Sequence, residues 1–153
     1  MNEELRALYQ EVIIDHGRHP RNFKKLDHPS FCQEGYNPLC GDHLKLYVRI
    51  ENNTIIDASF EGEGCAISMA ACSLLTERLK NTSITEARKL FDAFQILVTE
   101  ANPPDEIRDY LGKLSVLGGV RDFPVRIKCA TLAWHALKAG LDDINNNKVV
   151  STE

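Results

Sequence analysis

The chain has no apolar run approaching the roughly 20 residues that a membrane-spanning helix needs. It also lacks internal repeats and low-complexity segments. Its charges nearly balance, with 18 basic and 22 acidic residues and a net charge of −4. Such a balance gives no global attraction to nucleic acid. We therefore expect neither a membrane nor a nucleic acid as its partner.

Cysteine is scarce, and the five residues present are an odd number. No two of them form a Cys-x-x-Cys knuckle, and no Cys-His pair with an orienting Asn or Asp is suggested, which argues against cysteine-hydrolase chemistry. The acidic start, Met1-Asn2-Glu3-Glu4, does not resemble a signal peptide. These features favour a reducing cytoplasm, where separated cysteines are metal ligands or reactive thiols more often than disulfides.

The length and composition indicate one ordinary globular domain over residues 1–153. With 43% apolar and 26% charged residues, the chain can bury a core without the help of a metal. We expect residues from about 141 to 153 to form a frayed tail. The fold of such a chain need not depend on metal binding for its stability.

Hydrophobic spacing in the first half predicts a helix followed by a hairpin. Apolar residues recur at helical spacing over 3–16. The stretch 19–42 carries several prolines and glycines without a sustained period, and we expect an irregular loop covering one face. Apolar and polar residues then alternate over 44–50 and 56–60 on either side of Asn52-Asn53, which predicts an antiparallel hairpin with one buried face.

The second half of the sequence predicts a series of helices. Helical spacing follows Cys65 as far as Leu79, and Ser83-Ile84-Thr85-Glu86 is a capping box that opens a helix ending before Asn102-Pro103-Pro104. A short helix is expected over 105–111, a break at Gly118-Gly119, and a last helix from about Pro124 to Gly140. Strands followed by helices predict an α+β fold, with a small antiparallel sheet and helices packed on one of its faces.

Three cysteines and an aspartate stand where loops meet these elements, in Cys40-Gly41-Asp42, Cys65 and Cys129. Three thiolates and a carboxylate can complete a tetrahedral shell around a zinc-sized ion. The hairpin brings Asp42 and Cys65 together, and Cys65 falls near a helix N-terminus, which favours a thiolate. Only tertiary packing can deliver Cys129. Spacing alone leaves open the alternative of scattered buried thiols that act as small hydrophobic residues.

The pattern of Cys-Gly-Asp, Gly-Glu-Gly-Cys with a small-residue helix behind it, and a last cysteine opening the final helix resembles the IscU/NifU-N family of iron–sulfur assembly proteins. Tyr9 and the segment His19-Pro20-Arg21-Asn22 resemble that family's first helix and its Pro-Arg-Asn turn. The resemblance covers nearly the whole chain. It implies the family's SufE/NifU-like sandwich and a metal ligand set of Cys40, Asp42, Cys65 and Cys129.

Two departures from the scaffold members point to a branch. Lys128 stands where IscU-type scaffolds have a histidine before the last cysteine, and 63 residues separate Cys65 from Cys129, which is longer than in those scaffolds. In both respects the chain resembles the SufU-type, zinc-binding sulfurtransferase branch. That resemblance implies zinc as the cofactor, a pyridoxal-phosphate cysteine desulfurase (SufS-type) as the sulfur donor, and a cluster scaffold (SufBCD-type) downstream.

The same resemblance assigns roles near the metal. Cys40 is expected to be the sulfur-accepting thiol, freed by exchange of a zinc ligand, which makes the chain a sulfur acceptor and not a stand-alone enzyme. Arg126 and Lys128 are expected beside the site, with Arg126 orienting Asp42 through a charged hydrogen bond. Lys128 cannot ligate a metal while protonated, and it favours nearby thiolates electrostatically.

Two other functions remain open at this point. The same four ligands could hold iron or a transient [2Fe–2S] cluster, as in a scaffold protein. They could also form a purely structural zinc site in an adaptor, in which case loss of Cys40 would damage folding about as much as loss of Cys65. Cys32 has no paired ligand nearby in the predicted loop, and Cys72 lies about 140° around its predicted helix from the apolar stripe, so both are expected to play no part in the site.

Overall fold

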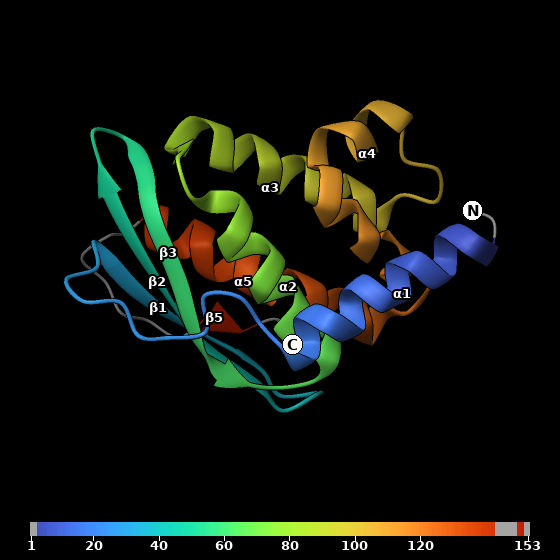
Figure 1. Cartoon of the computed structure of the whole chain (residues 1–153), viewed down its shortest axis with the longest axis horizontal. Coiled ribbons are helices and arrows are strands. Elements are labelled where there is room, and N and C mark those ends of the chain that lie inside the picture. The colour runs from blue at the N-terminus through green and yellow to red at the C-terminus, as the bar shows by residue number, and fades with distance from the viewer. Residues whose placement is uncertain (1–2, 143–149, 152–153) are drawn as a thin grey trace.

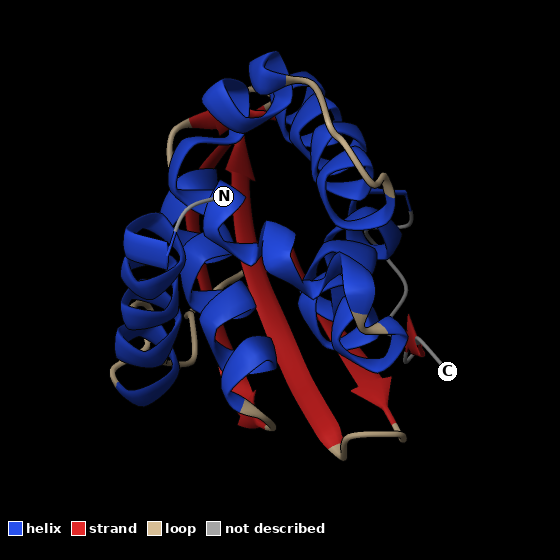
Figure 2. Ribbon diagram, turned by 90° about the vertical axis from the view of Figure 1, so that its right-hand side faces the viewer, coloured by secondary structure: helices blue, strands red, loops and turns tan. Residues whose placement is uncertain are grey.

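The computed structural model describes residues 3–142 and 150–151 of the chain. Its fold is α+β, as predicted: one sheet carries helices packed on one face (Figures 1 and 2). The elements are helix α1 (Glu3–Arg18), strands β1 (Phe31–Asn37), β2 (Asp42–Glu51) and β3 (Thr54–Glu63), helix α2 (Ala66–Leu79), strand β4 (Thr82–Ser83), helices α3 (Ile84–Thr99) and α4 (Asp105–Leu111), the 3₁₀ helix η1 (Gly112–Asp122), helix α5 (Pro124–Asp142) and strand β5 (Val150–Ser151).

The sheet has the strand order β4-β3-β2-β1-β5. Strands β1 to β4 pair antiparallel, and β5 adds a short parallel pairing to β1. The predicted hairpin is confirmed as β2 and β3, and Asn52 and Asn53 turn it with positive φ values of 51° and 60°. The alternation of β2 buries Leu44, Leu46 and Val48 against the helices. Hydrophobic burial on this single face holds the two layers together.

Helices α2 and α5 form the layer next to the sheet. Helix α2 contacts β3, α5 contacts β1 and β2, and α1 packs on the outside of α2 (Figure 1). Helix α2 is buried along most of its length, because it lies between the sheet and the outer helices. The predicted capping box is confirmed, since the Ser83 hydroxyl accepts a hydrogen bond from the Glu86 N–H at 3.0 Å.

The prediction of an irregular loop over 19–42 is wrong where β1 forms. The side chains of β1 alternate between buried and more exposed positions, as in any strand with one covered face. Its buried positions are mostly polar or small, so the apolar alternation that identifies strands is missing from the sequence. These buried positions are Phe31, Gln33, Gly35 and Asn37.

Two predicted helix breaks are also wrong. Gly118-Gly119 lies inside η1, where Leu114, Leu117 and Val120 are buried and hold the segment against the rest of the core. Helix α5 passes Gly140 and runs to Asp142. Gly140 serves packing instead, because a Cβ there would lie 2.1 Å from the Phe31 ring. Most of the predicted frayed tail lies outside the described residues, apart from Leu141 and Asp142 in α5 and from β5.

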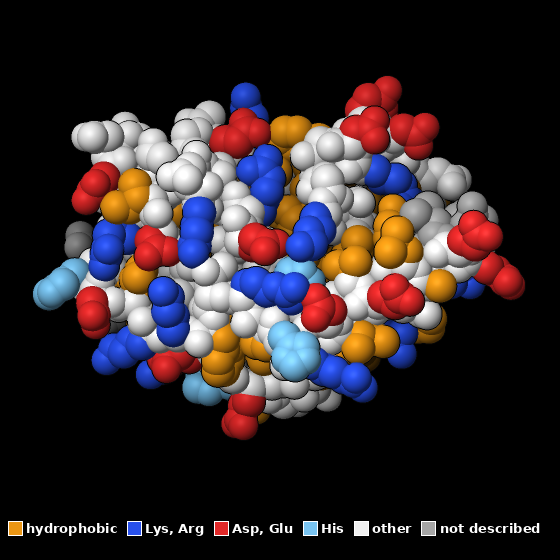
Figure 3. All heavy atoms as spheres, in the orientation of Figure 1, with side chains coloured by type: hydrophobic (Ala, Val, Ile, Leu, Met, Phe, Trp, Pro, Cys, Tyr) orange, Lys and Arg blue, Asp and Glu red, His pale blue; other side chains and the backbone are white. Residues whose placement is uncertain are grey.

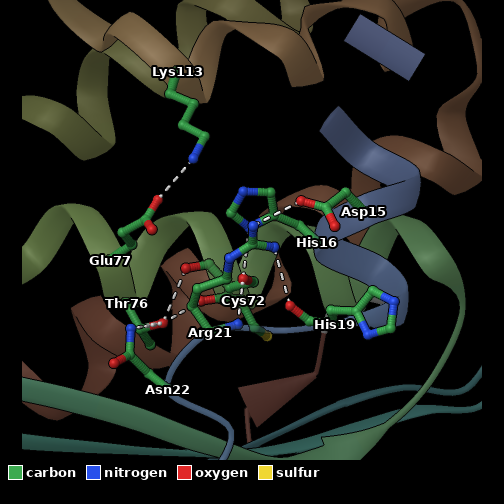
Figure 4. A network of polar contacts seen from close by, with 10 residues as sticks. Asp15, His16, His19, Arg21, Asn22, Cys72, Thr76, Glu77 and Lys113 are labelled. Carbon is green, nitrogen blue, oxygen red and sulfur yellow. Dashed lines mark hydrogen bonds and ion pairs between the residues drawn. The ribbon is translucent and has the colours of Figure 1, made fainter. Parts of the chain in front are cut away.

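A polar network fastens the end of α1 and the Pro-Arg-Asn segment to α2 (Figure 4). The buried His16 places Nδ1 at 2.7 Å from the Ser73 hydroxyl, which also accepts the Arg21 N–H at 2.8 Å. Ser73 on α2 therefore ties together His16 of α1 and the backbone of Arg21, and burial lowers the pKa of His16, which favours its neutral form. Asn22 Nδ2 donates to Thr76 Oγ1 at 3.3 Å.

Acidic and basic side chains are interspersed on the face seen in Figure 3, with small apolar patches between them. In the part of the chain that is described, no helix combines the length and the apolar character needed to cross a membrane.

Candidate metal centre

The site begins at the loop between β1 and β2. Asn37 and Asp42 are the last pair of the β1–β2 ladder, so the four residues between them form a tight connection. Gly41 takes a positive φ of 68°, which lets the chain turn directly from Cys40 into β2. Asp42 is fully buried, whereas Cys40 in the loop is half-buried.

The strand β3 returns the chain to the same point, as predicted for the hairpin. The backbone N–H of Cys65 donates to Asp42 Oδ1 at 2.9 Å. Gly64 allows this approach, because a Cβ on residue 64 would lie 2.4 Å from that oxygen. Cys65 is the N-cap of α2, and its sulfur accepts the Ser68 N–H at 3.4 Å. The predicted proximity of Asp42 and Cys65 is therefore confirmed.

Tertiary packing delivers the remaining cysteine. Helix α5 packs on β1 and α2, and this places the buried Cys129 with its Sγ 3.1 Å from the Cys40 Sγ. The ligand atoms of Cys40, Asp42 and Cys129 all lie within 4.8 Å of one another and could hold a metal ion. Cys65 stands at the edge of this group, where its thiol interacts with that of Cys129.

Burial dominates the acidity of two of these thiols. It raises the pKa of Cys65, an effect that the Ser68 N–H only partly offsets. Burial also raises the pKa of Cys129 strongly, and its contacts with Cys40, Asp42 and Cys65 add to the shift. The helix N-terminus therefore favours a thiolate at Cys65, as expected, but in the protein without a metal burial outweighs this effect and leaves the pKa above its ordinary value. A cation would have to supply the stabilisation that deprotonates these thiols.

Asn37 belongs to the site and was missed in the sequence. Its fully buried side-chain amide donates from Nδ2 to Asp42 Oδ2 at 3.2 Å and to Cys129 Sγ at 3.4 Å. A strand prediction over 31–37 would have shown that residue 37 faces inward beside the Cys-Gly-Asp motif. The missing apolar alternation in β1 hid that signal.

The two basic residues expected beside the metal are arranged differently from the prediction. Asp42 accepts hydrogen bonds from Asn37 Nδ2 and from the Cys65 N–H, and among the described contacts Arg126 makes no hydrogen bond to Asp42. The Arg126 guanidinium lies instead over the Phe123 ring, 4.6 Å from its centre. The predicted orienting bond is therefore wrong. Lys128 is half-buried one residue before Cys129, and its electrostatic role stays a prediction.

The other two cysteines lie elsewhere. Cys72 is completely buried within α2 and packs in the core. Cys32 lies on β1 opposite Tyr47, on the face of the strand that points away from the helices. Neither belongs to the group of ligand atoms that could hold a metal in the described residues.

The thiols open onto a depression in the surface. Exposed apolar side chains form part of its rim, with Phe123 48% and Val125 46% exposed. A second groove, between α1 and η1, adjoins the depression, and the two share Ile67, Asp122, Phe123 and Arg126. The depression is lined by Cys40, Cys65, Cys129, Phe123, Val125 and Arg126, among others. A protein partner can therefore reach the cysteines from this side.

The donor set fits zinc. Two sulfurs bound to a tetrahedral zinc at about 2.3 Å lie about 3.8 Å apart. The ligand atoms of Cys40, Asp42 and Cys129 already lie within 4.8 Å of one another, so small side-chain movements are enough to surround an ion. Two thiols and a buried carboxylate, with a third thiol adjacent, match the thiolate-rich ligand set that zinc accepts.

Comparison with known proteins agrees with this geometry. The profile of the NifU-like N terminal domain matches residues 8–150. The chain belongs to this family. It is 41% identical over 140 residues to the zinc-dependent sulfurtransferase SufU of Bacillus subtilis strain 168, covering 92% of this chain and 93% of the relative. It is 39% identical over 138 residues to the iron–sulfur cluster assembly scaffold protein IscU of Streptococcus pyogenes serotype M1, covering 90% and 85%.

The fold of the family is also found in solved structures. The N-terminal part of a NifU-like protein from Brucella abortus superposes with a TM-score of 0.80, covering 92% of this chain and 96% of that one. At 20% identity, this likeness bears on the fold alone. The predicted sandwich is thereby confirmed. Members of this NifU-like family that are similar to this chain include both a sulfurtransferase and a scaffold, so membership by itself leaves the choice between them open.

Proposed function

We propose that this NifU-like protein serves iron–sulfur cluster biogenesis as a zinc-binding sulfur acceptor. In this function Cys40, Asp42, Cys65 and Cys129 hold zinc, and a pyridoxal-phosphate cysteine desulfurase of the SufS type is the sulfur donor in the cytoplasm. The sulfur then passes to a SufBCD-type cluster scaffold. The exposure of Cys40 beside two buried ligands supports this function best, together with the similarity to the Bacillus sulfurtransferase over nearly its whole length.

The transfer step is a thiol–persulfide exchange. The Cys40 thiolate attacks the outer sulfur of the donor's cysteine persulfide, a new S–S bond forms at Cys40, and the old S–S bond breaks. The donor cysteine leaves as a thiolate, so the reaction needs no external oxidant or reductant. When bound, zinc would keep the ligand thiols deprotonated at neutral pH without redox chemistry of its own.

Position selects Cys40 over the other thiols as the acceptor. It lies in the loop between β1 and β2, is half-buried, and lines the surface depression. Cys129 is buried within α5 and accepts a hydrogen bond from Asn37, and Cys65 caps α2. Movement of Cys40 therefore disturbs neither a helix nor the sheet, whereas movement of the other two would.

The rim of the depression is suited to a protein donor. Val125, at the start of α5, lines the depression and is 46% exposed, and Leu39, next to Cys40 in the chain, is 58% exposed. Clustered exposed apolar residues around a reactive group are typical of a docking surface. A desulfurase that covers this rim would exclude water from the thiol during transfer.

Sulfur labelling tests the proposal. A desulfurase supplied with ³⁵S-cysteine should transfer label to the zinc-loaded chain, and Cys40→Ser should lose that label while still folding. Cys32→Ser is the matched control, because Cys32 is also half-buried but lies on the outer face of β1. A Cys40→Ser protein that accepts as much label as Cys32→Ser would refute Cys40 as the acceptor.

A scaffold for a transient [2Fe–2S] cluster is the second candidate function. It is favoured by the similarity to the Streptococcus scaffold, which is nearly as high as the similarity to the sulfurtransferase. Metal analysis of purified protein, combined with desulfurase activity measured with and without the chain, separates the two. Stoichiometric zinc with strong activation supports sulfur transfer, whereas a stable chromophore after anaerobic reconstitution with iron and sulfide, without activation, supports the scaffold.

A further inference from the structure

A single buried amide connects two of the candidate ligands. Asn37 Nδ2 carries two hydrogens, and its two contacts are Asp42 Oδ2 at 3.2 Å and Cys129 Sγ at 3.4 Å. The three side chains come from β1, β2 and α5, so the amide spans the sheet and the helix layer. Its position is set by the ladder, because Asn37 and Asp42 are paired residues of β1 and β2.

We propose that Asn37 is a positioning residue of the metal centre, which holds Asp42 and Cys129 at the spacing that the metal needs and leaves Cys40 as the releasable ligand. This inference rests on metal binding at the proposed site, but not on sulfur transfer. It adds a residue outside the ligand set, identified only by its contacts.

The chemistry of the amide supports this role. Metal ligation requires an ionised carboxylate and a thiolate, and both accept hydrogen bonds that N–H donors strengthen. The opposite orientation would direct Oδ1 at the carboxylate and the sulfur, and three acceptors would then face one another. Oδ1 itself is buried and has no hydrogen-bond partner among the described residues. Both Nδ2 hydrogens bond the two candidate ligands, while Oδ1 is left without a hydrogen bond. A buried acceptor without a hydrogen bond costs free energy of folding.

The same contacts divide the ligands into held and releasable groups. Asp42 receives bonds from Asn37 and from the Cys65 N–H, and Cys129 receives one from Asn37. The amide does not reach the Cys40 thiol in the loop, and the contact of that sulfur with Cys129 Sγ loses its shared hydrogen once both ligate a metal as thiolates. Hydrogen-bonded ligands lose more on leaving a metal than a ligand that has no such anchor. Cys40 is therefore the ligand that leaves at the lowest cost.

Asn37→Leu tests the inference, because leucine branches at Cγ as asparagine does and cannot donate hydrogen bonds. The matched control is Gln33→Leu, which removes another buried amide from the same face of the same strand; the Gln33 Nε2 only bonds the neighbouring Glu34 carbonyl, at 3.2 Å. We expect the zinc dissociation constant to rise about 10- to 100-fold in Asn37→Leu and to stay within about threefold in Gln33→Leu. Both are measured against a competing chelator.

Cobalt substitution provides a readout that general loss of stability would not change. The Co²⁺ form of Asn37→Leu should show altered d–d bands, because the ligands adopt a different geometry, while that of Gln33→Leu should match the wild type. A double-mutant cycle of Asn37→Leu with Asp42→Ala should show coupling, since one change removes the donor and the other the acceptor of the same hydrogen bond. Asn37→Ala, which avoids any overpacking, replaces Asn37→Leu in both experiments if the leucine variant does not fold.

The outcomes separate this inference from the proposed function. Unchanged zinc affinity and cobalt bands in the Asn37 variants, with zinc-bound wild type accepting sulfur, would overturn the inference alone. Weakened zinc binding in Asn37→Leu, with no sulfur acceptance by the wild type, would support the inference and overturn sulfur transfer. A wild-type chain that binds neither Zn²⁺ nor Co²⁺ would overturn both.

Discussion

The substitution Gly64→Ala should damage the metal centre through a single added methyl group. The new Cβ would lie 2.4 Å from Asp42 Oδ1 and 3.1 Å from its Cγ, where ordinary contacts need about 3.4 Å. The Asp42 Cα, at 3.2 Å, is also too close for the backbone to give way freely. The carboxylate must therefore retreat by about 1 Å, and site geometry tolerates only about 0.5 Å.

The retreat also breaks a hydrogen bond. Asp42 Oδ1 would move out of reach of the Cys65 N–H, now 2.9 Å away. A bond to an ionised group contributes about 1.5–3 kcal/mol, which corresponds to about a 10- to 100-fold change in a binding constant. We therefore expect Gly64→Ala to weaken zinc binding by about that factor.

The assay is competition for zinc against a chelator of known affinity, with thermal unfolding of the metal-free protein measured in parallel. Gly119→Ala is the matched control, because a Cβ on that exposed glycine meets no atom within 4 Å. It should bind zinc as the wild type does. Equal zinc affinity in the two variants would show that Asp42 is not a ligand held by the Gly64 segment, and would refute the reasoning.

Further predictions concern pH, stability and docking. Burial raises the pKa values of Cys65 and Cys129, so zinc binding should release at least two protons. Below those pKa values, the zinc affinity should rise by about 100-fold for each unit of increasing pH. A dissociation constant that is independent of pH would contradict this. Burial lowers the pKa of His16, so the unfolded chain takes up the proton first, and stability to urea should fall as the pH drops below about 6.5, less steeply in His16→Leu. An unchanged slope in that variant would argue against the His16–Ser73 network. Val125→Asp should weaken desulfurase binding by at least about tenfold. Leu8→Asp should not, because Leu8 is a similarly exposed apolar residue on α1 outside the depression. Equal affinities of the two variants for the desulfurase would exclude the rim as the docking surface.

The accuracy of the sequence-based predictions followed the strength of local signals. The β2–β3 hairpin, the Ser83 cap and the start of α5 at Pro124 were all predicted, because each depends on alternation, capping or proline placement within a few residues. Strand β1 was missed since its inward positions are largely polar or glycine. The glycines of η1 and Gly140 suggested breaks, although the packing around them keeps both helices continuous.

The candidate site divides in the same way. The proximity of Asp42 and Cys65 followed from the hairpin, which joins them through local pairing. The approach of Cys129 to Cys40 depends on how α5 packs against β1 and α2, and residues 89 positions apart meet only through that packing. The predicted bond from Arg126 to Asp42 is wrong because the fold directs the Arg126 guanidinium over the Phe123 ring, while Asn37 and the Cys65 N–H bond the carboxylate.

By itself, the sequence determined the α+β class, the hairpin and the identity of the thiols and the carboxylate, because these depend on side-chain chemistry and on short-range periodicity. Only the tertiary structure decided that Asn37 bonds Asp42 and Cys129, that Cys40 is half-buried beside these two buried residues, and that burial raises the pKa values of Cys65 and Cys129. Hydrogen bonds between distant segments and the exclusion of water exist only once the sheet and helix layers have packed together. They therefore leave no periodic signal in the order of the residues.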